Sequence, residues 1–333
     1  MPQDTTIYWD GNGRLPALID SLPLEQQQTV LEMIHEQKKA LTYTDPNGPY
    51  YFVVGFTILF SLAAIYSNYK TKRSKNQHPL KNDDDHLPTI PPPPVALYYK
   101  GNTLNFEDKL IKEVLNKHSP FYNKLNDDGK IKFGRRLKKF IYEKTFIIHD
   151  VSGFKEMPIL ISATAIQISF GLDRYLLPNF DTFNIYPGEF IGTHPFLRIL
   201  AGNVTGKTIN LSWKHFLEGF QYPDDGQNVG MHELAHALHY QTFVAEVNID
   251  REFKDGFVDF DSTGNKVFGL EKVAGGGLYT SYAMRDFQEF WAESVEIFFE
   301  KPLQMKNTYP DLYAAMSDLL NQDPAGIHSG DLA

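Results

Sequence analysis

The pattern of apolar and polar positions divides the chain into four segments. In residues 1–48, an interrupted apolar stripe from Leu24 to Leu41 predicts one amphipathic helix. Residues 49–69 form an uncharged apolar run, and residues 70–97 are polar and end near the stiff proline run Pro91–Pro94. Helical and strand patterns resume after this linker. We therefore expect an N-terminal segment, an apolar span, a linker and one large domain of residues 98–333.

The apolar run predicts a single transmembrane helix at residues 49–69. Residues 50–69 carry no charged side chain, a length close to the shortest that spans a bilayer. Tyrosines stand at both ends of the run, as in the aromatic belts of membrane proteins: Tyr50, Tyr51, Tyr66 and Tyr69. Four basic residues follow within residues 70–75, so the positive-inside rule places the large domain in the cytoplasm, at the cell inner membrane. The alternative is a buried helix of a folded core.

The pattern after residue 98 predicts an α+β fold that is mainly helical. Runs with a period of about 3.6 residues predict helices, and short apolar runs between turn residues predict strands. The expected helices cover residues 105–118, 130–142, 158–172, 213–220, 231–243, 287–301 and 310–320, and the expected strands cover residues 145–149, 183–186 and 208–211. Residues 244–280 show no regular period, so we expect them to be irregular.

One predicted helix carries the motif His232-Glu233-Leu234-Ala235-His236. Positions i and i+4 lie on one face of a helix, one turn apart, so both imidazoles can reach one metal ion. Glu233, next to the first histidine, can then reach a water on that ion and act as a general base. The alternative is a core helix that carries two histidines by chance.

A second predicted helix offers a carboxylate for the same ion. Catalytic zinc usually takes three protein ligands, and the chain has no cysteine, so the third ligand must be His, Asp or Glu. Glu289 and Glu293 lie one turn apart in a segment rich in aromatic residues, where a carboxylate is costly to bury without a partner. Asp286 and Glu289 also fit a capping box at the start of this helix. The two interpretations do not exclude each other.

Composition narrows the function further. The 333 residues are 42% hydrophobic and 22% charged, as in ordinary globular proteins. A net charge of −9 argues against a nucleic-acid partner. The absence of cysteine excludes disulfides and thiolate nucleophiles, and it fits a reducing compartment.

Several stretches together resemble the Mlc titration factor A family of zinc peptidases, whose catalytic core is gluzincin-like and similar to that of anthrax lethal factor. The resemblance covers about residues 100–325. The stretches that carry it are residues 185–190, 210–213, 226–236, 289–293, 298–302 and 309–313, together with Tyr282. It implies that His232, His236 and Glu289 hold zinc, and that Glu233 is the base. It also implies that Tyr282 faces the transition state, and that Glu293 contacts a ligand rather than the ion.

Two features depart from the family pattern. His239 stands where the family usually has an aspartate, and residues 1–97 lie outside the usual family domain. His239 follows His232 by seven residues and faces the same side, but it lies too far along a straight helix to join the same ion. We expect it to touch the ligands or to line the wall of the cleft.

These observations predict a membrane-tethered zinc peptidase that acts on a peptide or protein substrate. Zinc would lower the pKa of a bound water, and Glu233 would take its proton and pass it to the leaving amine. The alternative is a zinc-containing protein that sequesters a regulatory protein partner without turnover. A purely structural zinc is disfavoured, because such sites are usually closed by four ligands rich in cysteine.

Overall fold

The computed structural model describes residues 4–6, 96–150, 156–192, 198–275 and 277–326. The helix predicted in residues 1–48, the span at residues 49–69 and nearly all of the linker lie outside these residues. Within the part that the structure describes, no helix has the length and apolar character needed to cross a bilayer.

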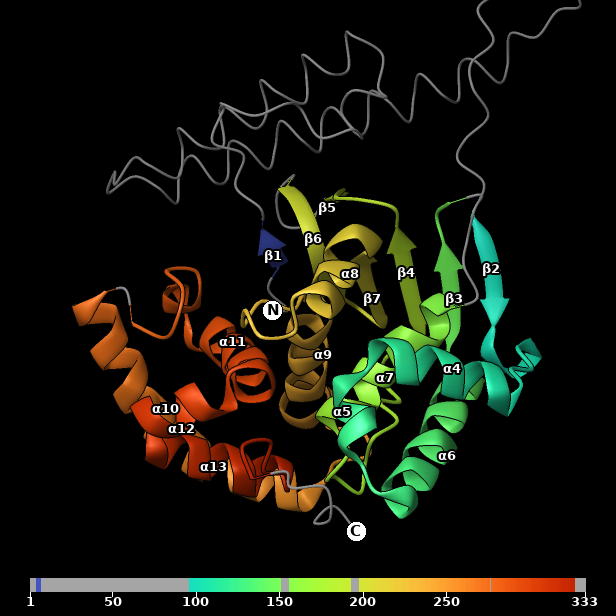
Figure 1. Cartoon of the computed structure of the whole chain (residues 1–333). Coiled ribbons are helices and arrows are strands. Elements are labelled where there is room, and N and C mark those ends of the chain that lie inside the picture. Colours follow the sequence, from blue (N-terminus) through green and yellow to red (C-terminus); the bar gives the residue numbers. More distant parts are fainter. Residues whose placement is uncertain (1–3, 7–95, 151–155, 193–197, 276, 327–333) are drawn as a thin grey trace, which may run out of the picture. The chain divides into compact units, whose positions relative to one another are not determined.

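The described strands form one mixed seven-stranded sheet (Figure 1). Its order is β1-β6-β7-β4-β3-β2, and β5 also pairs with β6. Strands β3, β4 and β7 run parallel to one another, and the other pairs are antiparallel. The strands are β1 (Asp4–Thr6), β2 (Leu97–Lys100), β3 (Thr145–Ile148), β4 (Thr182–Tyr186), β5 (Phe190–Gly192), β6 (Arg198–Thr205) and β7 (Thr208–Ser212).

Helices make up most of the described chain, so the expected mixed and mainly helical fold is confirmed. The α-helices are α4 (Asp108–His118), α5 (Pro120–Lys124), α6 (Asp127–Glu143), α7 (Glu156–Ile168), α8 (Trp213–Gln221), α9 (Val229–Tyr240), α10 (Arg251–Ala274), α11 (Phe287–Glu300), α12 (Pro302–Thr308) and α13 (Pro310–Leu320). Short helical turns are η1 (Gly101–Thr103), η2 (Gln241–Ala245) and η3 (Ala283–Arg285).

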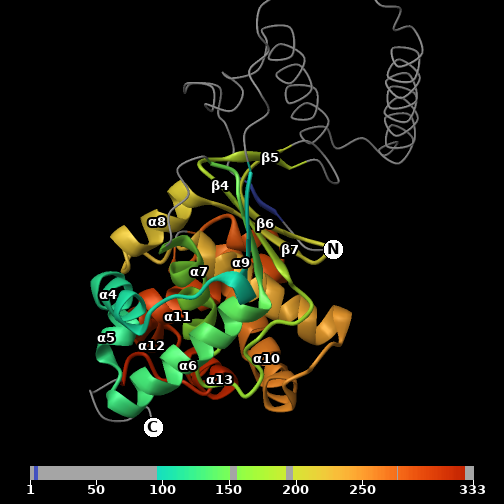
Figure 2. The ribbon, with the colours of Figure 1, turned by 90° about the vertical axis from the view of Figure 1, so that its right-hand side faces the viewer.

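One face of the sheet packs against helices because its strands alternate. Phe183 and Ile185 of β4 are buried, as are Ile209 and Leu211 of β7, while the residues between them are only half-buried. Helix α9 lies against β6 and β7 on this face, and α11 lies against α9 (Figure 2). The sheet thus supports the helix that carries the His-Glu-x-x-His motif.

The prediction of irregular structure was wrong for residues 251–274, which form helix α10. Phe253, Phe257, Phe260 and Val267 are buried at helical spacing, and Asp250 caps the helix by accepting a hydrogen bond from the Phe253 N–H. Three glycines and the acidic residues between these positions obscured the period in the sequence. Packing against α13 stabilises the helix and overrides the low propensity of glycine.

Candidate metal centre

Helix α9 presents the two motif histidines on one buried face. Its N-cap is Asn228, whose side-chain oxygen accepts a hydrogen bond from the Met231 N–H at 3.0 Å. His232 and His236 lie one turn apart, and each side chain is about 5% exposed. Apolar residues of the same helix, such as Leu234 and Ala235, are also buried, so α9 and both imidazoles lie in the interior.

Helix α11 brings the third candidate ligand to the histidines. Asp286 caps this helix, because its carboxylate accepts hydrogen bonds from the N–H groups of Gln288 and Glu289 at 3.0 and 3.1 Å. The Glu289 side chain points to the histidines. Asp286 is therefore the N-cap, but the Glu289 side chain faces the histidines and does not complete the predicted capping box. Trp291 fixes α11 along α9 by donating its indole N–H to the Ala235 carbonyl at 3.0 Å.

His232, His236 and Glu289 converge on one point. The Nε2 of His232 lies 3.0 Å from Oε2 of Glu289, and the two Nε2 atoms lie 3.2 Å apart. The Nε2 of His236 lies 3.4 Å from the same carboxylate oxygen. All three potential ligand atoms lie within 4.8 Å of one another. Two imidazole nitrogens and one carboxylate oxygen form a donor set that fits catalytic zinc, which keeps a further position open.

The charges at this site are strongly coupled. Burial lowers the pKa of His232, but Glu296 and Glu289 outweigh this effect and hold that pKa well above its usual value. Burial raises the pKa of Glu289, but hydrogen bonds from His232 and His236 hold it well below its usual range. The pKa of His236 is lowered, chiefly by burial. A cation bound at this point would compensate the negative charge of Glu289, as the proton on His232 does in this structure.

Glu296 holds His232 from behind, a contact that the sequence analysis did not single out. The Nδ1 of His232 lies 2.7 Å from Oε1 of Glu296, and the Asn228 N–H donates to the other oxygen of that carboxylate. Metal-binding histidines commonly donate their second ring N–H to a carboxylate, which fixes the ring and its tautomer. Glu296 follows Glu289 by seven residues, so its helical spacing was the available signal.

Four glutamates form a buried row along α11. They are Glu289, Glu293, Glu296 and Glu300, at positions i, i+4, i+7 and i+11. Glu300 accepts hydrogen bonds from the Asn228 side chain at 2.9 Å and from the Gly226 N–H at 3.0 Å. The row therefore fixes the start of α9 as well as the candidate ligands.

Glu293 contacts the segment before α11. Its carboxylate accepts hydrogen bonds from the N–H and the hydroxyl of Thr280, both at 2.6 Å. Burial raises the pKa of Glu293 to about 7, against the effect of these bonds. The hydrogen bond to His232 belongs to Glu296 instead.

The side chain of Glu233 is fully buried where α9 packs against strand β6. A Cβ atom on Gly202 of β6 would lie only 2.6 Å from Cγ and Oε1 of Glu233. Glycine at this position therefore gives the Glu233 carboxylate its space next to the strand.

Tyr282 reaches the same centre from the segment before α11. Its hydroxyl donates to Oε1 of Glu289 at 3.2 Å, and its ring centroid lies 6.2 Å from that of His232. The Arg285 guanidinium lies 4.7 Å from the centre of the tyrosine ring. The structure thus places Tyr282 beside the candidate ligands.

His239 packs among aromatic side chains of neighbouring elements. Its ring centroid lies 4.9 Å from that of Phe243 and 5.3 Å from that of Phe257. Burial lowers its pKa to about 4, with a smaller effect from His236. Among the described residues, the cluster with metal-binding geometry contains His232, His236 and Glu289 but not His239.

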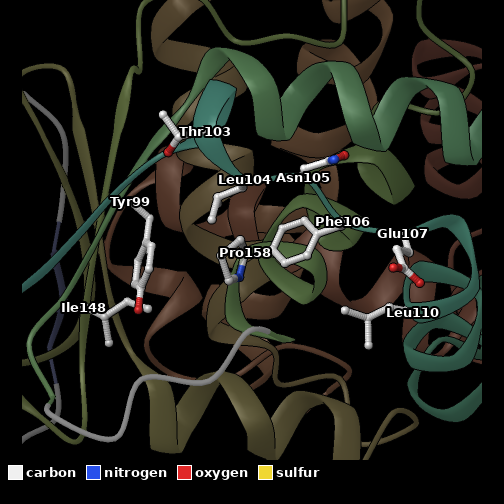
Figure 3. Close-up of a pocket in the computed structure, with 9 residues that line it drawn as sticks. All are labelled: Tyr99, Thr103, Leu104, Asn105, Phe106, Glu107, Leu110, Ile148 and Pro158. Carbon is white, nitrogen blue, oxygen red and sulfur yellow. The ribbon is translucent and has the colours of Figure 1, made fainter.

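A cavity of about 380 Å³ lies elsewhere in the fold (Figure 3). Strands β2 and β3 contribute Tyr99 and Ile148, and helices α4 and α7 contribute Leu110 and Pro158. The residues that line it are not those of the metal centre, so the cavity does not bear on the chemistry of that centre.

The chain is similar to known proteins over the region that contains this site. The family model described as glucose-regulated metallo-peptidase M90 matches residues 102–320. The uncharacterized protein slr2042 of Synechocystis sp. is 23% identical over 220 residues, which cover 61% of this chain and 80% of that protein. The matched region contains α9, α11 and the whole candidate metal centre.

Proposed function

Since this chain belongs to the glucose-regulated metallopeptidase family M90, which includes Mlc titration factor A, we propose that it is a zinc-dependent peptidase. The observation that carries the proposal is the convergence of His232, His236 and Glu289, with the buried Glu233 next to His232 in the sequence. A purely structural site has no use for a carboxylate next to its first ligand. The donor set is also the one that catalytic zinc takes in peptidases.

The proposed roles follow from the positions of the side chains. When bound, zinc supplies Lewis acidity, which makes a nearby water acidic and the scissile carbonyl electrophilic. Glu233 takes a proton from the attacking water and delivers it to the leaving amine. Glu296 holds His232 in the tautomer whose Nε2 faces the ligand cluster. The Tyr282 hydroxyl donates a hydrogen bond to the oxygen on which negative charge grows.

We propose further that residues 49–69 anchor the protein in the inner membrane with the peptidase domain in the cytoplasm. The uncharged run, its terminal tyrosines and the basic residues at positions 70–75 support this arrangement. The anchor would confine cleavage to substrates that approach the membrane surface.

A peptide-library digest by the full-length protein tests the peptidase proposal. Cleavage should depend on zinc and stop with a chelator, and His232→Ala, His236→Ala and Glu289→Ala should each lose the metal. If the zinc-loaded protein cleaves no peptide, a protein that binds a regulatory partner without turnover becomes the better account. If Glu289→Ala keeps its zinc while Glu293→Ala loses it, the proposed third ligand is wrong.

A further inference from the structure

Tyr282 belongs to a segment that buried glutamates hold at its beginning and in its middle. Helix α10 ends at Ala274, and its C-cap Gly275 has a φ of 64°, in the region that favours glycine. The segment formed by residues 277–285, here called the tyrosine segment, then leads to Asp286 at the start of α11. It contains little regular structure of its own apart from the turn η3. Its position therefore depends on contacts with its neighbours.

Glu271 of α10 holds the beginning of the tyrosine segment. This buried carboxylate accepts hydrogen bonds from the Leu278 N–H at 2.9 Å and from the Tyr309 hydroxyl at 2.6 Å. A Cβ on Gly277 would lie 2.2 Å from both carboxylate oxygens, so only glycine allows this close approach. The first residues of the segment are thus attached to α10 rather than to the metal centre.

Glu293 of α11 holds the middle of the tyrosine segment. It takes both donors of Thr280, the backbone N–H and the hydroxyl, one on each carboxylate oxygen. Thr280 Oγ1 in turn accepts a longer hydrogen bond from the Ala283 N–H at 3.4 Å. Tyr282 lies between these two positions. Hydrogen bonds to a buried carboxylate are stronger than neutral ones, so this contact dominates the local geometry.

The two hydrogen bonds from Thr280 explain how the Glu293 carboxylate can be buried. The side chain is about 5% exposed, and within the described part of the chain it has no ion pair with a lysine, arginine or histidine. A buried carboxylate without a cationic partner is costly unless hydrogen bonds satisfy it. The same side chain lies one turn from Glu289, whose carboxylate receives the Tyr282 hydroxyl. Helix α11 therefore holds the tyrosine segment at two points, Thr280 and Tyr282.

We propose that Glu293 is a positioning residue, which binds both donors of Thr280 and so keeps the Tyr282 hydroxyl at the metal centre. The effect of Glu293 on catalysis rests on the proposed peptidase function. The attachment of the tyrosine segment to Glu293 does not rest on it. The two middle glutamates of α11 then have separate tasks: Glu296 orients His232, and Glu293 fixes the tyrosine segment.

Thr280→Val tests this assignment in the full-length protein, because it removes only the hydroxyl and keeps the shape of the side chain. Thr280 is exposed, so the variant should fold. It should lower kcat by roughly 10-fold to 100-fold, as small misplacements of catalytic groups do, with little change in KM or zinc content. Thr280→Ser should restore the activity. Ser281→Ala, which removes the next hydroxyl along the chain, should have no effect.

A double-mutant cycle separates positioning from a general loss of stability. If Thr280 acts through Tyr282, Thr280→Val should cost nothing further in a Tyr282→Phe background. Equal losses in both backgrounds would overturn the proposal. Loss of zinc in Thr280→Val would also overturn it, because Thr280 would then act through the metal ligands.

Hydrogen exchange provides a readout that does not depend on activity. Thr280→Val and Glu293→Ala should speed amide exchange in residues 277–285 roughly tenfold or more, with α9 unchanged. Unchanged exchange in this segment contradicts the proposed attachment. Faster exchange in a protein whose wild type cleaves no peptide supports the attachment and refutes only the peptidase function.

Discussion

At the scale of single residues, the site depends on contacts that leave little space. The Glu233 carboxylate lies against Gly202, where a Cβ would come within 2.6 Å of Cγ and Oε1 and within 2.9 Å of Cδ. Contacts this short require one of the two groups to move. Since Gly202 is part of the sheet, the glutamate side chain is the group that moves.

Gly202→Ala should therefore displace the base without removing the metal. We expect zinc content to remain near that of the wild type and hydrolysis to fall roughly 100-fold, the usual contribution of a positioned base. Gly269→Ala is the control, because a Cβ on this exposed glycine of α10 meets no atom within 4 Å. Full activity in Gly202→Ala would show that the base is elsewhere or has room to adapt.

Zinc affinity distinguishes the two middle glutamates of α11. Glu296→Gln weakens the hydrogen bond that orients His232, so zinc affinity should fall about 10-fold to 100-fold, as for other carboxylates that hold metal-binding histidines. Glu293→Gln should bind zinc nearly as tightly as the wild type. Competition with a chelator measures both constants. The opposite ranking would assign the orienting role to Glu293.

Some of these residues could be predicted from the sequence and others could not, for physical reasons. The spacing of His232 and His236 is local, so a helix alone brings them together. The spacing of Glu293 and Glu296 is equally compatible with a contact to His232, because both lie on the same face of α11 as Glu289. Only the packing angle of α9 and α11 decides between them. The role of Gly202 depends on the contact of β6 with α9, far apart in sequence.

At the scale of secondary-structure elements, a charged cluster ties α8 to the turn between β4 and β5. His215 lies 2.7 Å from Oε1 of Glu189 and 2.6 Å from Oε2 of Glu218, and the Lys214 ammonium donates to Glu189 at 3.0 Å. Burial raises the pKa of Glu189, but hydrogen bonds from its own backbone, His215 and Lys214 outweigh this effect and lower it to about 2.

This shift predicts how stability changes with acid. The folded pKa lies below the usual value of 4.5, so ionised Glu189 stabilises the fold above pH 4.5, and this contribution disappears as the pH falls towards about 2. Glu189→Gln should lower the unfolding temperature at pH 7, and the difference from the wild type should shrink below pH 4.5. Glu107→Gln, an exposed control, should show no such trend. A difference that does not depend on pH would contradict this account.

Elements with a clear period could be predicted, and those that depend on tertiary contacts could not. The expected helix at residues 310–320 is found with those bounds as α13, and the expected strands at residues 145–149, 183–186 and 208–211 are found within one residue. Helix α10 was missed because its apolar face is narrow and the helix contains three glycines. Strand β6 was missed because its pairing with β5 and β7 is not encoded in a local alternation.

At the scale of the whole molecule, the proposed membrane anchor and the pairing of strand β1 require different membrane topologies. Residues Asp4–Thr6 form β1 and pair with β6 in the sheet. A single span at residues 49–69 would put these residues and the peptidase domain on opposite sides of the membrane. Insertion therefore requires that β1 leave β6.

Labels at the two ends of the chain test the anchor. The proposal predicts that a tag before residue 4 lies outside the inner membrane and that a reporter after Ala333 is active in the cytoplasm. Labels on the same side, or a full-length protein found in the soluble fraction, would refute a single span and favour the pairing of β1 with β6.

The central claim is that Glu233 acts as the base beside a zinc ion held by His232, His236 and Glu289. Hydrolysis by Glu233→Gln, measured together with its zinc content, tests this claim most directly. The substitution keeps the shape of the side chain and leaves the three ligands intact. We predict about one zinc per chain and a loss of at least about 100-fold in hydrolysis. Unchanged hydrolysis by the zinc-loaded variant would contradict the account.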